Sequence, residues 1–264
     1  MRPPLKWAGG KRWQVPHLAP LWAAAGPRRL VEPFCGGLAV ALGLSPDRAL
    51  LNDANTHLIN FYRWIQRGLV TSIDMRNDRA LYDRHRTRFN RLLECGEGEG
   101  AEAAALFYFL NRTGFNGLCR FNRSGAFNVP FGRYTRIAYT RDFGAYADAL
   151  RRWTFSDGDF AALPIEPSDF IYADPPYDVA FRSYEKVGFS WGDQVRVATW
   201  LSRHEGPVVL VNQATSRIVD LYRSLDYALT FIEGPRRISC DGDRTPAQEV
   251  IATRHVVPKR EGSR

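Results

Sequence analysis

Short apolar runs that end in a turn, each followed by a helical pattern, recur along this chain and constrain its fold more than any other feature. The run 29–33 ends in a glycine-containing turn at 34–37, and the run 49–52 ends at Asp53. Each run indicates a buried strand that leads into a helix. Strands that alternate with helices in this way predict a parallel sheet covered by helices.

The helices that follow these two strands are also visible in the sequence. The first is expected at 39–44. The second carries apolar residues at the i, i+3, i+4, i+7 spacing of an amphipathic helix, namely Leu58, Phe61, Tyr62 and Ile65. Asn55 or Asp53 can cap this second helix at its N-terminus.

The same alternation returns in the last part of the chain. We expect strands at 153–156, 169–173 and 208–211, helices near 194–204 and 216–225, and further strands near 229–233 and 249–254. Between the two regions, residues 78–112 have a helical pattern that the glycine-rich segment 96–100 interrupts. Residues 113–140 fit no period and are rich in Gly, Asn, Arg and aromatic residues, which predicts a loop-rich insert.

The tetrapeptide Asp174-Pro175-Pro176-Tyr177 directly follows the expected strand 169–173. In an open α/β sheet, ligands bind outside the carboxyl ends of the strands. Two prolines remove two N–H donors and fix φ twice, so a backbone carbonyl beside them can point outward. A carboxylate, a rigid carbonyl and an aromatic ring form a socket for an exocyclic amine on a planar ring; a Pro-Pro turn without a ligand is the alternative.

The composition favours an anionic partner, with nucleic acid the commonest. The 264 residues carry a formal net charge of +8. The four cysteines show no metal-ligand spacing, the five histidines are scattered, and we expect no metal site. No signal peptide pattern and no apolar run long enough to span a membrane occur, so we expect a soluble, intracellular protein.

Three further segments suggest binding functions. Glycines in the turn Glu32–Gly37 allow a ligand to approach the backbone, and Asp53 lies where an acid receives ribose hydroxyls. An ordinary tight turn and a helix cap are the respective alternatives. The segment Lys6–Lys11 places a tryptophan between lysines, next to a Gly-Gly pair that can serve as a hinge over a ligand. Residues 112–136 contain five arginines interleaved with aromatic residues, a pattern typical of DNA contacts, although a solvated basic loop has the same charge.

Together these segments resemble the Dam-type DNA adenine N6-methyltransferases, the alpha arrangement of amino-methyltransferases. The resemblance runs from Leu5 to about Arg254 and keeps the family's order of cofactor motif, target-recognition insert and catalytic motif. The matching stretches are Leu5–Lys11, Glu32–Gly37, Phe115–Asn122, Phe127–Tyr134 and Asp174–Tyr177. Leu38 stands where the family's Phe-x-Gly-x-Gly pattern has its last glycine.

The resemblance implies an α/β fold: a Rossmann-like S-adenosylmethionine-dependent methyltransferase sheet with a helical, loop-rich DNA-recognition insert. It implies S-adenosylmethionine as the methyl donor and no metal. The residues that it assigns to the cofactor are Trp7, Lys11, Phe34, Gly36, Gly37, Asp53, Asp159, Phe160 and Asp174. The residues that it assigns to catalysis are Asp174, Pro175, Pro176 and Tyr177.

The insert resembles those of enzymes that read GATC in double-stranded DNA. By that resemblance Lys6 and Arg120 contact guanine, Phe115, Asn116, Leu118 and Pro130 contact or wedge the central steps, and Arg133 and Tyr134 hold the backbone, with Asn122 also assigned to DNA. Phe115 stands where a tyrosine is common. We expect no membrane and no obligate protein partner, and a cytoplasmic, nucleoid-associated location.

The expected reaction is methylation of N6 of an adenine flipped out of the duplex, by an enzyme that serves restriction–modification or another role. N4-cytosine methylation is the nearest alternative in chemistry, and a DNA-binding protein without catalysis is the alternative from another class. We expect the catalytic domain at 1–75 and 141–258, the recognition insert at 76–140 and a frayed tail at 259–264.

Overall fold

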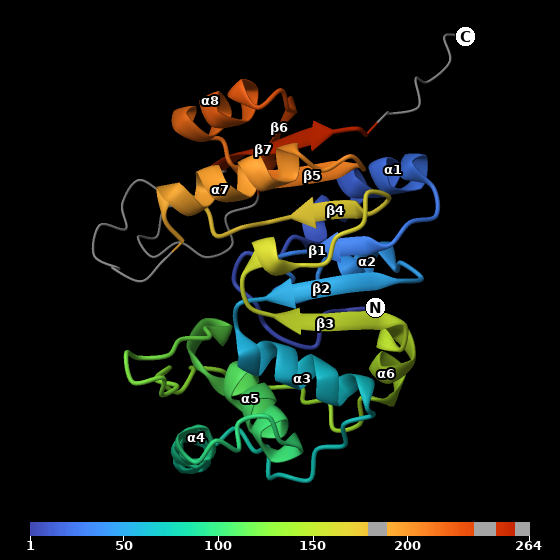
Figure 1. Cartoon of the computed structure of the whole chain (residues 1–264). Coiled ribbons are helices and arrows are strands. Elements are labelled where there is room, and N and C mark those ends of the chain that lie inside the picture. The colour runs from blue at the N-terminus through green and yellow to red at the C-terminus, as the bar shows by residue number, and fades with distance from the viewer. Residues whose placement is uncertain (179–188, 235–246, 257–264) are drawn as a thin grey trace. The chain divides into compact units, whose positions relative to one another are not determined.

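The computed structural model describes residues 1–178, 189–234 and 247–256, and the expected tail 259–264 lies outside this part of the chain. Seven described strands form one mixed sheet in the order β3-β2-β1-β4-β5-β7-β6 (Figure 1). The chain divides into two compact units, one made of 1–12, 36–45 and 53–158, the other of 13–35, 46–52 and 159–264. This division rests on compactness alone, and the functional boundaries expected at 75/76 and 140/141 stay a prediction.

The second unit contains the strands β1 (Leu30–Glu32), β4 (Phe170–Ala173), β5 (Val208–Gln213), β6 (Ala228–Gly234) and β7 (Ala247–Arg254), and all of β2 (Ala49–Asp53) except its last residue. β1 pairs in parallel with β2 and β4, and β4 pairs in parallel with β5. The parallel sheet predicted from the βα alternation is therefore confirmed. β7 pairs antiparallel with both β5 and β6, an arrangement that the sequence pattern did not specify.

Alternation along these strands divides their apolar side chains between two faces. On one face Val31, Ile171 and Leu210 pack in a core with α7 (Trp191–Ser202) and α8 (Ser216–Ser224). On the other face, Trp22 of α1 (Val15–Ala25) meets Phe170 edge to face at 5.2 Å. Helices thus cover both faces of the sheet in this unit, as its apolar strands require (Figure 1).

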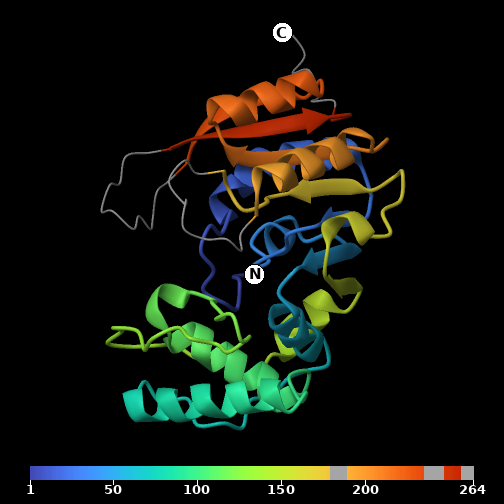
Figure 2. The ribbon, with the colours of Figure 1, turned by 60° about the vertical axis from the view of Figure 1, so that its left-hand side comes forward.

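The first unit contains β3 (Trp153–Asp157) and the helices α2 (Ala41–Leu44), α3 (Thr56–Gln66), α4 (Arg79–Glu94), α5 (Ala101–Thr113) and α6 (Gly144–Leu150). Asn55 caps α3 by accepting hydrogen bonds from the backbone of His57 and Leu58. α4 and α5 lie side by side, as Figures 1 and 2 show. The predicted break at 96–100 falls between them.

The segment that follows α5 has little regular structure, as its composition predicts. It holds a short 3-10 turn, η2 (Phe115–Gly117), and two isolated strand bridges, Gly114 with Phe131 and Phe121 with Phe127. Buried aromatic side chains anchor it, since the Phe127 ring packs edge to face on Phe89 of α4. The loop-rich insert therefore has a fixed base on the helices and an exposed outer side.

Candidate functional site

The order of the strands reverses between β1 and β4. The chain continues from β1 to β2 on one side, and from β4 to β5 on the other. In a parallel sheet, such a reversal opens a crevice outside the carboxyl ends of the two central strands, and ligands bind there. The two segments that follow these strands are the glycine turn after β1 and the tetrapeptide after β4, which were both predicted as binding elements.

The turn after β1 is tied to the end of β2. Asn52 donates from its side chain to the carbonyl of Pro33 at 3.0 Å, and its own carbonyl accepts from Cys35 at 2.7 Å. Phe34 then packs on Phe160 at 5.4 Å between ring centroids and on Phe189 at 5.6 Å. Phe34 and Phe160, two predicted cofactor residues, are thus in direct contact.

Asp159 is fixed beside Phe160. Its carboxylate accepts from the backbone of Ala161 at 2.9 Å and from Arg196 of α7 at 2.7 Å. The hydrogen bond from Arg196 lowers the pKa of Asp159 below its usual value. The Arg196 guanidinium also lies 4.4 Å from the centroid of the Phe160 ring. Arg196 therefore holds both residues of the predicted Asp159-Phe160 contact.

Hydrogen bonds from α7 and β5 hold the backbone of the tetrapeptide. The Gln194 side chain donates to the carbonyl of Pro176 at 2.7 Å, and it accepts from Asn212 at 3.0 Å. Asn212 also accepts from the backbone N–H of Asp178 at 3.3 Å. The buried carboxylate of Asp178 receives two hydrogen bonds from Arg217 of α8. The chain before and after Tyr177 is therefore fixed to the neighbouring elements.

The Tyr177 hydroxyl donates to the carboxylate of Glu249 at 2.7 Å. The same carboxylate oxygen accepts from Gln14 at 2.7 Å, and Gln14 accepts from Tyr172 at 2.9 Å. Burial, and then the nearby charges of Asp174 and Glu249, raise the pKa of Tyr177 well above its usual value. Tyr177 is consequently a neutral hydrogen-bond donor over the whole physiological range.

Sequence reasoning did not identify Gln14, Gln194, Asn212 or Glu249 as parts of this site. Each is a buried polar side chain. No motif contains them, and Gln14 lies 235 positions from Glu249 in the sequence. Only the fold brings such residues together.

In the first unit, Asp53 at the end of β2 binds the glycine turn rather than capping a helix. Its two carboxylate oxygens accept from the backbone of Gly36 at 3.0 Å and of Asn55 at 2.9 Å. Burial raises the pKa of Asp53, and these two hydrogen bonds act in the opposite direction. Tyr62 of α3 donates to the carbonyl of Gly36 at 2.7 Å. Asp53 and Gly36, both predicted cofactor residues, are thus directly bonded.

Trp7 packs against the glycines of this turn. A Cβ atom at Gly36 would lie 2.6 Å from the Trp7 indole nitrogen, and one at Gly37 would lie 2.7 Å from the Trp7 Cβ. Both positions must therefore be glycine for the ring to lie there. The predicted cofactor residue Lys11, which follows on the same N-terminal segment, is buried. Three predicted cofactor residues, Trp7, Gly36 and Gly37, form one contact set.

Leu38 occupies the position where the family pattern has a glycine. It adopts φ of 60°, in the left-handed region, and its side chain is fully buried. The turn therefore keeps a glycine-like conformation despite the substitution.

Lys6 is pinned to the end of α5 and to Tyr134. Its backbone N–H donates to Asn111 at 2.9 Å, its ammonium donates to the carbonyl of Arg112 at 2.8 Å, and the ammonium lies 3.3 Å from the centroid of the Tyr134 ring. Burial, and then the charge of Arg112, lower the pKa of Lys6 to about 8. Lys6 and Tyr134, both predicted DNA contacts, are therefore side by side.

Most of the other predicted DNA residues are exposed. Phe115 is 40% exposed, and its backbone N–H donates to the carbonyl of Pro130, itself exposed. Asn116 and Arg133 are also exposed, whereas Leu118 is half-buried. The exposed Phe115 ring offers an apolar face that a planar partner can contact.

Two of these residues also have local structural partners. Arg120 donates to the side chain of Asn128 at 2.8 Å. The Asn122 side-chain oxygen accepts hydrogen bonds from Ser124 and Ala126, and these bonds stabilise the turn that runs from 122 to 126. Asn122 therefore shapes the tip of the segment, whatever else it contacts.

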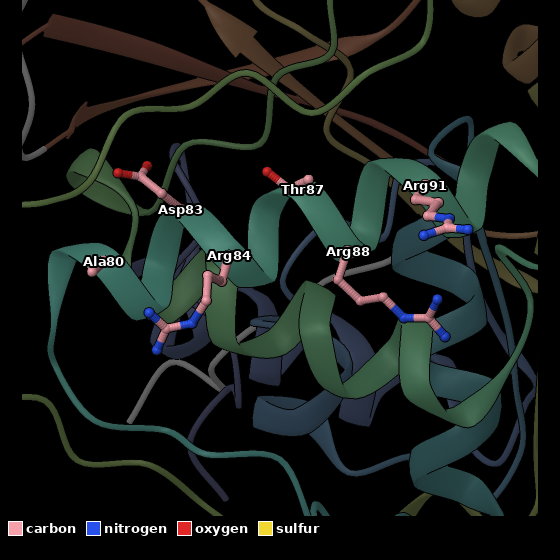
Figure 3. Close-up of a pocket in the computed structure, with 6 residues that line it drawn as sticks. All are labelled: Ala80, Asp83, Arg84, Thr87, Arg88 and Arg91. Atoms are coloured by element: carbon pink, nitrogen blue, oxygen red, sulfur yellow. The ribbon is translucent and has the colours of Figure 1, made fainter.

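A shallow hollow lies on the outer side of α4. Figure 3 shows that the residues lining it lie along this one helix, from Ala80 to Arg91, and include the long side chains of Arg84 and Arg88. Arg88 forms two hydrogen bonds with Glu102, both at 2.7 Å. None of the predicted site residues lines the hollow.

The donor groups suit a nucleoside cofactor without phosphates. Asp53 is a buried carboxylate at a strand end, and a carboxylate can accept more hydrogen bonds than the two that Asp53 receives here. The glycine turn has no Gly-Lys-Ser/Thr continuation that would hold a phosphate. Among the described residues, no three His, Cys, Asp or Glu side chains gather as metal ligands, and no helix is long and apolar enough to cross a membrane.

The family model and the curated relatives that match this chain are all DNA methyltransferases. The model of the D12 class N6 adenine-specific DNA methyltransferase family matches residues 7–236. The retron Ec67 DNA adenine methylase of Escherichia coli is 35% identical over 263 residues, which cover 94% of this chain and 90% of that protein. The type II methyltransferase M1.LlaDCHI of Lactococcus lactis subsp. cremoris is 33% identical and covers 97% and 96% of the two chains. Among solved structures, a Pyrococcus horikoshii protein described provisionally as an RNA methyltransferase superposes with a TM-score of 0.46 at 8% identity, over 94% of this chain and 84% of that one.

Proposed function

Because the chain belongs to the D12 class N6 adenine-specific DNA methyltransferases, we propose that it transfers a methyl group from S-adenosylmethionine to N6 of an adenine in duplex DNA. The observation that carries this proposal is the position of Asp174–Tyr177. The tetrapeptide directly follows β4 at the reversal of strand order, where α/β sheets bind ligands.

In the proposed reaction, the Asp174 carboxylate and the Pro175 carbonyl accept hydrogen bonds from the N6 amine of adenine. The lone pair of an aromatic amine is delocalised into the ring, so this amine is a poor nucleophile. Two acceptors favour a pyramidal nitrogen whose lone pair points out of the ring plane. Held in this orientation, the amine is placed for attack without a covalent enzyme intermediate.

We propose that the cofactor is held by the residues that the resemblance assigned to it: Trp7, Lys11, Phe34, Gly36, Gly37, Asp53, Asp159, Phe160 and Asp174. Asp53 accepts hydrogen bonds from the ribose hydroxyls, and the Phe34 and Phe160 rings offer apolar surface to the adenine ring of the cofactor. When bound, S-adenosylmethionine supplies a methyl group on a sulfonium centre, which is already a strong electrophile. No metal takes part in this proposal.

The target adenine lies inside the duplex, so we propose that it flips out at a cost of a few kcal/mol of stacking and pairing. The exposed Phe115 ring fills the space that the base leaves, with Asn116, Leu118 and Pro130 beside it. The flipped base stacks on the ring of Tyr177.

We propose GATC as the recognition sequence. Lys6 and Arg120 contact guanine, and Arg133, Tyr134 and Asn122 hold the backbone. Arginine and lysine are the side chains that best read the two acceptors of guanine in the major groove. The insert 76–140 is then the recognition domain, and 1–75 with 141–258 the catalytic domain.

A methylation assay tests the proposal directly. Purified protein is incubated with radiolabelled S-adenosylmethionine and duplexes that contain GATC, GTAC or CATG at one position, and the modified base is identified by mass spectrometry. We expect N6-methyladenine in the GATC duplex only, and at least a thousandfold loss with Asp174→Ala while DNA binding stays within about threefold. If the products contain N4-methylcytosine, the target base is cytosine and not adenine. Label at another sequence, or no label in any of the three duplexes, would refute GATC.

A further inference from the structure

Tyr177 is fixed at both ends of its side chain. At the backbone end, Gln194 binds the carbonyl of Pro176 and Asn212 binds the N–H of Asp178. At the far end, the Tyr177 hydroxyl donates to Glu249 of β7 at 2.7 Å. Because the hydroxyl lies on the long axis of the ring, this bond fixes the direction in which the ring points.

The carboxylate of Glu249 is itself oriented. Gln14 donates to the same oxygen at 2.7 Å, and the Gln14 side-chain oxygen accepts from Tyr172 at 2.9 Å. Glu249 is 8% exposed and Gln14 is fully buried. Glu249 therefore cannot turn toward solvent without breaking bonds to both Tyr177 and Gln14.

Burying the carboxylate of Glu249 at this position has a free-energy cost. Taking a carboxylate out of water costs free energy unless hydrogen bonds replace those that it made with water. At Glu249 the hydrogen bonds from Tyr177 and Gln14 offset part of this cost. A charged acceptor makes a shorter and stronger hydrogen bond to a phenol than a neutral one does. Tyr177 stays protonated, since burial and then the charges of Asp174 and Glu249 raise its pKa, so the bond to Glu249 persists.

We propose that Glu249 is a positioning residue for methyl transfer: by accepting the hydrogen bond of the Tyr177 hydroxyl, it fixes the ring on which the target adenine stacks. This inference rests on the proposed function, in which Tyr177 receives the flipped base. Glu249 acts through Tyr177 and does not itself touch the base.

Two single variants test the role. We expect Glu249→Ala to lower kcat about tenfold, as the loss of a charge-assisted hydrogen bond predicts, with KM for DNA changed less than threefold. Tyr227→Phe is the matched control, because it removes a buried tyrosine hydroxyl that donates to the carbonyl of Ala198 and has no bond to Glu249, Gln14 or Tyr177. We expect kcat of that variant to stay within twofold of wild type. An equal loss of kcat in both variants would show that Glu249 has no specific part in methyl transfer, and would overturn the proposal.

A double-mutant cycle tests whether Glu249 acts through the Tyr177 hydroxyl. Tyr177→Phe keeps the ring and removes the hydroxyl. In that background we expect Glu249→Ala to change kcat by less than twofold, whereas independent residues would give multiplied losses. Multiplied losses would refute the mechanism. If Glu249→Ala does not fold, Glu249→Gln takes its place, with a loss of a few fold expected beside Tyr177 and none beside the phenylalanine.

The stacking itself has a spectroscopic readout. With 2-aminopurine in place of the target adenine, stacking on Tyr177 quenches the fluorescence of the flipped base. We expect brighter emission from complexes of Glu249→Ala than from those of wild type or Tyr227→Phe. Wild-type protein that methylates no adenine would defeat the proposed function. An active wild type together with unchanged kcat and emission in Glu249→Ala would defeat only the role of Glu249.

Discussion

Leu38 stores backbone strain at the end of the glycine turn. Its φ of 60° is a conformation that costs a residue with a Cβ about 1–2 kcal/mol, and that glycine adopts freely. The side chain is fully buried, which offsets the strain. The family pattern predicts a glycine at this position. From the sequence alone, one could not tell whether the leucine alters the backbone conformation of the turn or adopts the conformation of a glycine. The structure shows that the turn geometry is kept.

In most positions an alanine variant is more stable than a glycine variant, and the strain at Leu38 predicts the opposite order there. We expect Leu38→Gly to be more stable than Leu38→Ala by about 1 kcal/mol, although both lose about 2 kcal/mol or more of buried contacts relative to wild type. Leu42, a buried residue of α2, is the control. There alanine should exceed glycine, as is usual in helices. Urea denaturation of the four variants measures both orders, and an alanine advantage at position 38 would contradict the strain.

The lowered pKa of Lys6 predicts a pH dependence of DNA binding. Lys6 is charged below its pKa of about 8 and neutral above it. The affinity for DNA should therefore fall as pH rises from 7 to 9, by at most tenfold per pH unit above 8. Lys6→Arg should remove this dependence, because arginine stays charged. Fluorescence anisotropy at fixed ionic strength measures it, and equal pH profiles of the two proteins would rule out Lys6 as the cause.

The same shift has the opposite sign for folding. Between pH 8 and the ordinary lysine value of 10.5, the unfolded chain binds more protons at position 6 than the folded chain does. This single group therefore makes the free energy of unfolding rise with pH over that interval. Binding and stability thus respond to pH in opposite directions there.

At the scale of the elements, the sequence predicted those strands and helices whose local pattern matches their burial. β1, β2, β4 and β5 are apolar runs because helices cover both faces of the parallel sheet. α1 was not predicted because Pro20 lies inside it, and a proline in the interior normally argues against a helix. The position of β7 between β5 and β6 was also out of reach, because pairing partners are chosen by the whole sheet and not by the strand itself.

Phe115 in the 3-10 turn η2 should contribute to base flipping, and this contribution can be measured separately from the methyl transfer itself. We expect Phe115→Ala to lower kcat/KM for a paired duplex at least tenfold, but to matter little when the target adenine faces a mismatch, whose flipping costs less. Phe231→Ala on β6 is a matched control, since Phe231 is 41% exposed and Phe115 is 40% exposed. Stability should change by less than about 0.5 kcal/mol in both, as for exposed sites. Equal losses on paired and mismatched duplexes would contradict a wedge at Phe115.

At the scale of the whole molecule, the net charge of +8 favours DNA without choosing where it binds. Composition thus predicted the class of partner, while the candidate contacts came from the resemblance to enzymes that read GATC. The network of Gln14, Tyr172, Tyr177 and Glu249 could not be predicted, because its members are spread along the chain and none belongs to a motif except Tyr177.

The salt dependence of DNA binding distinguishes the effect of a single phosphate contact from the effect of the net charge of the protein. Removing one phosphate contact reduces the slope of log K against log salt concentration by about 0.9. We expect this change for Arg133→Ala and none for Arg151→Ala, an exposed arginine at the end of α6 that lowers the net charge equally. Titrations between 50 and 300 mM NaCl give the slopes. Equal slopes in the two variants would mean that only total charge matters.

The position of β7 between β5 and β6 also limits which strands can pair while the chain is being synthesised. β6 leaves the ribosome before β7, yet in the finished sheet it pairs with β7 and is separated from β5 by it. A nascent chain that ends before residue 247 has no strand to join them, so β6 must wait unpaired. Glu249 arrives on that same late strand. Tyr177 therefore gains its hydrogen bond to Glu249 only after β7 has been synthesised and has paired with β5. A chain that ends before β7 would lack this bond even if it could bind DNA.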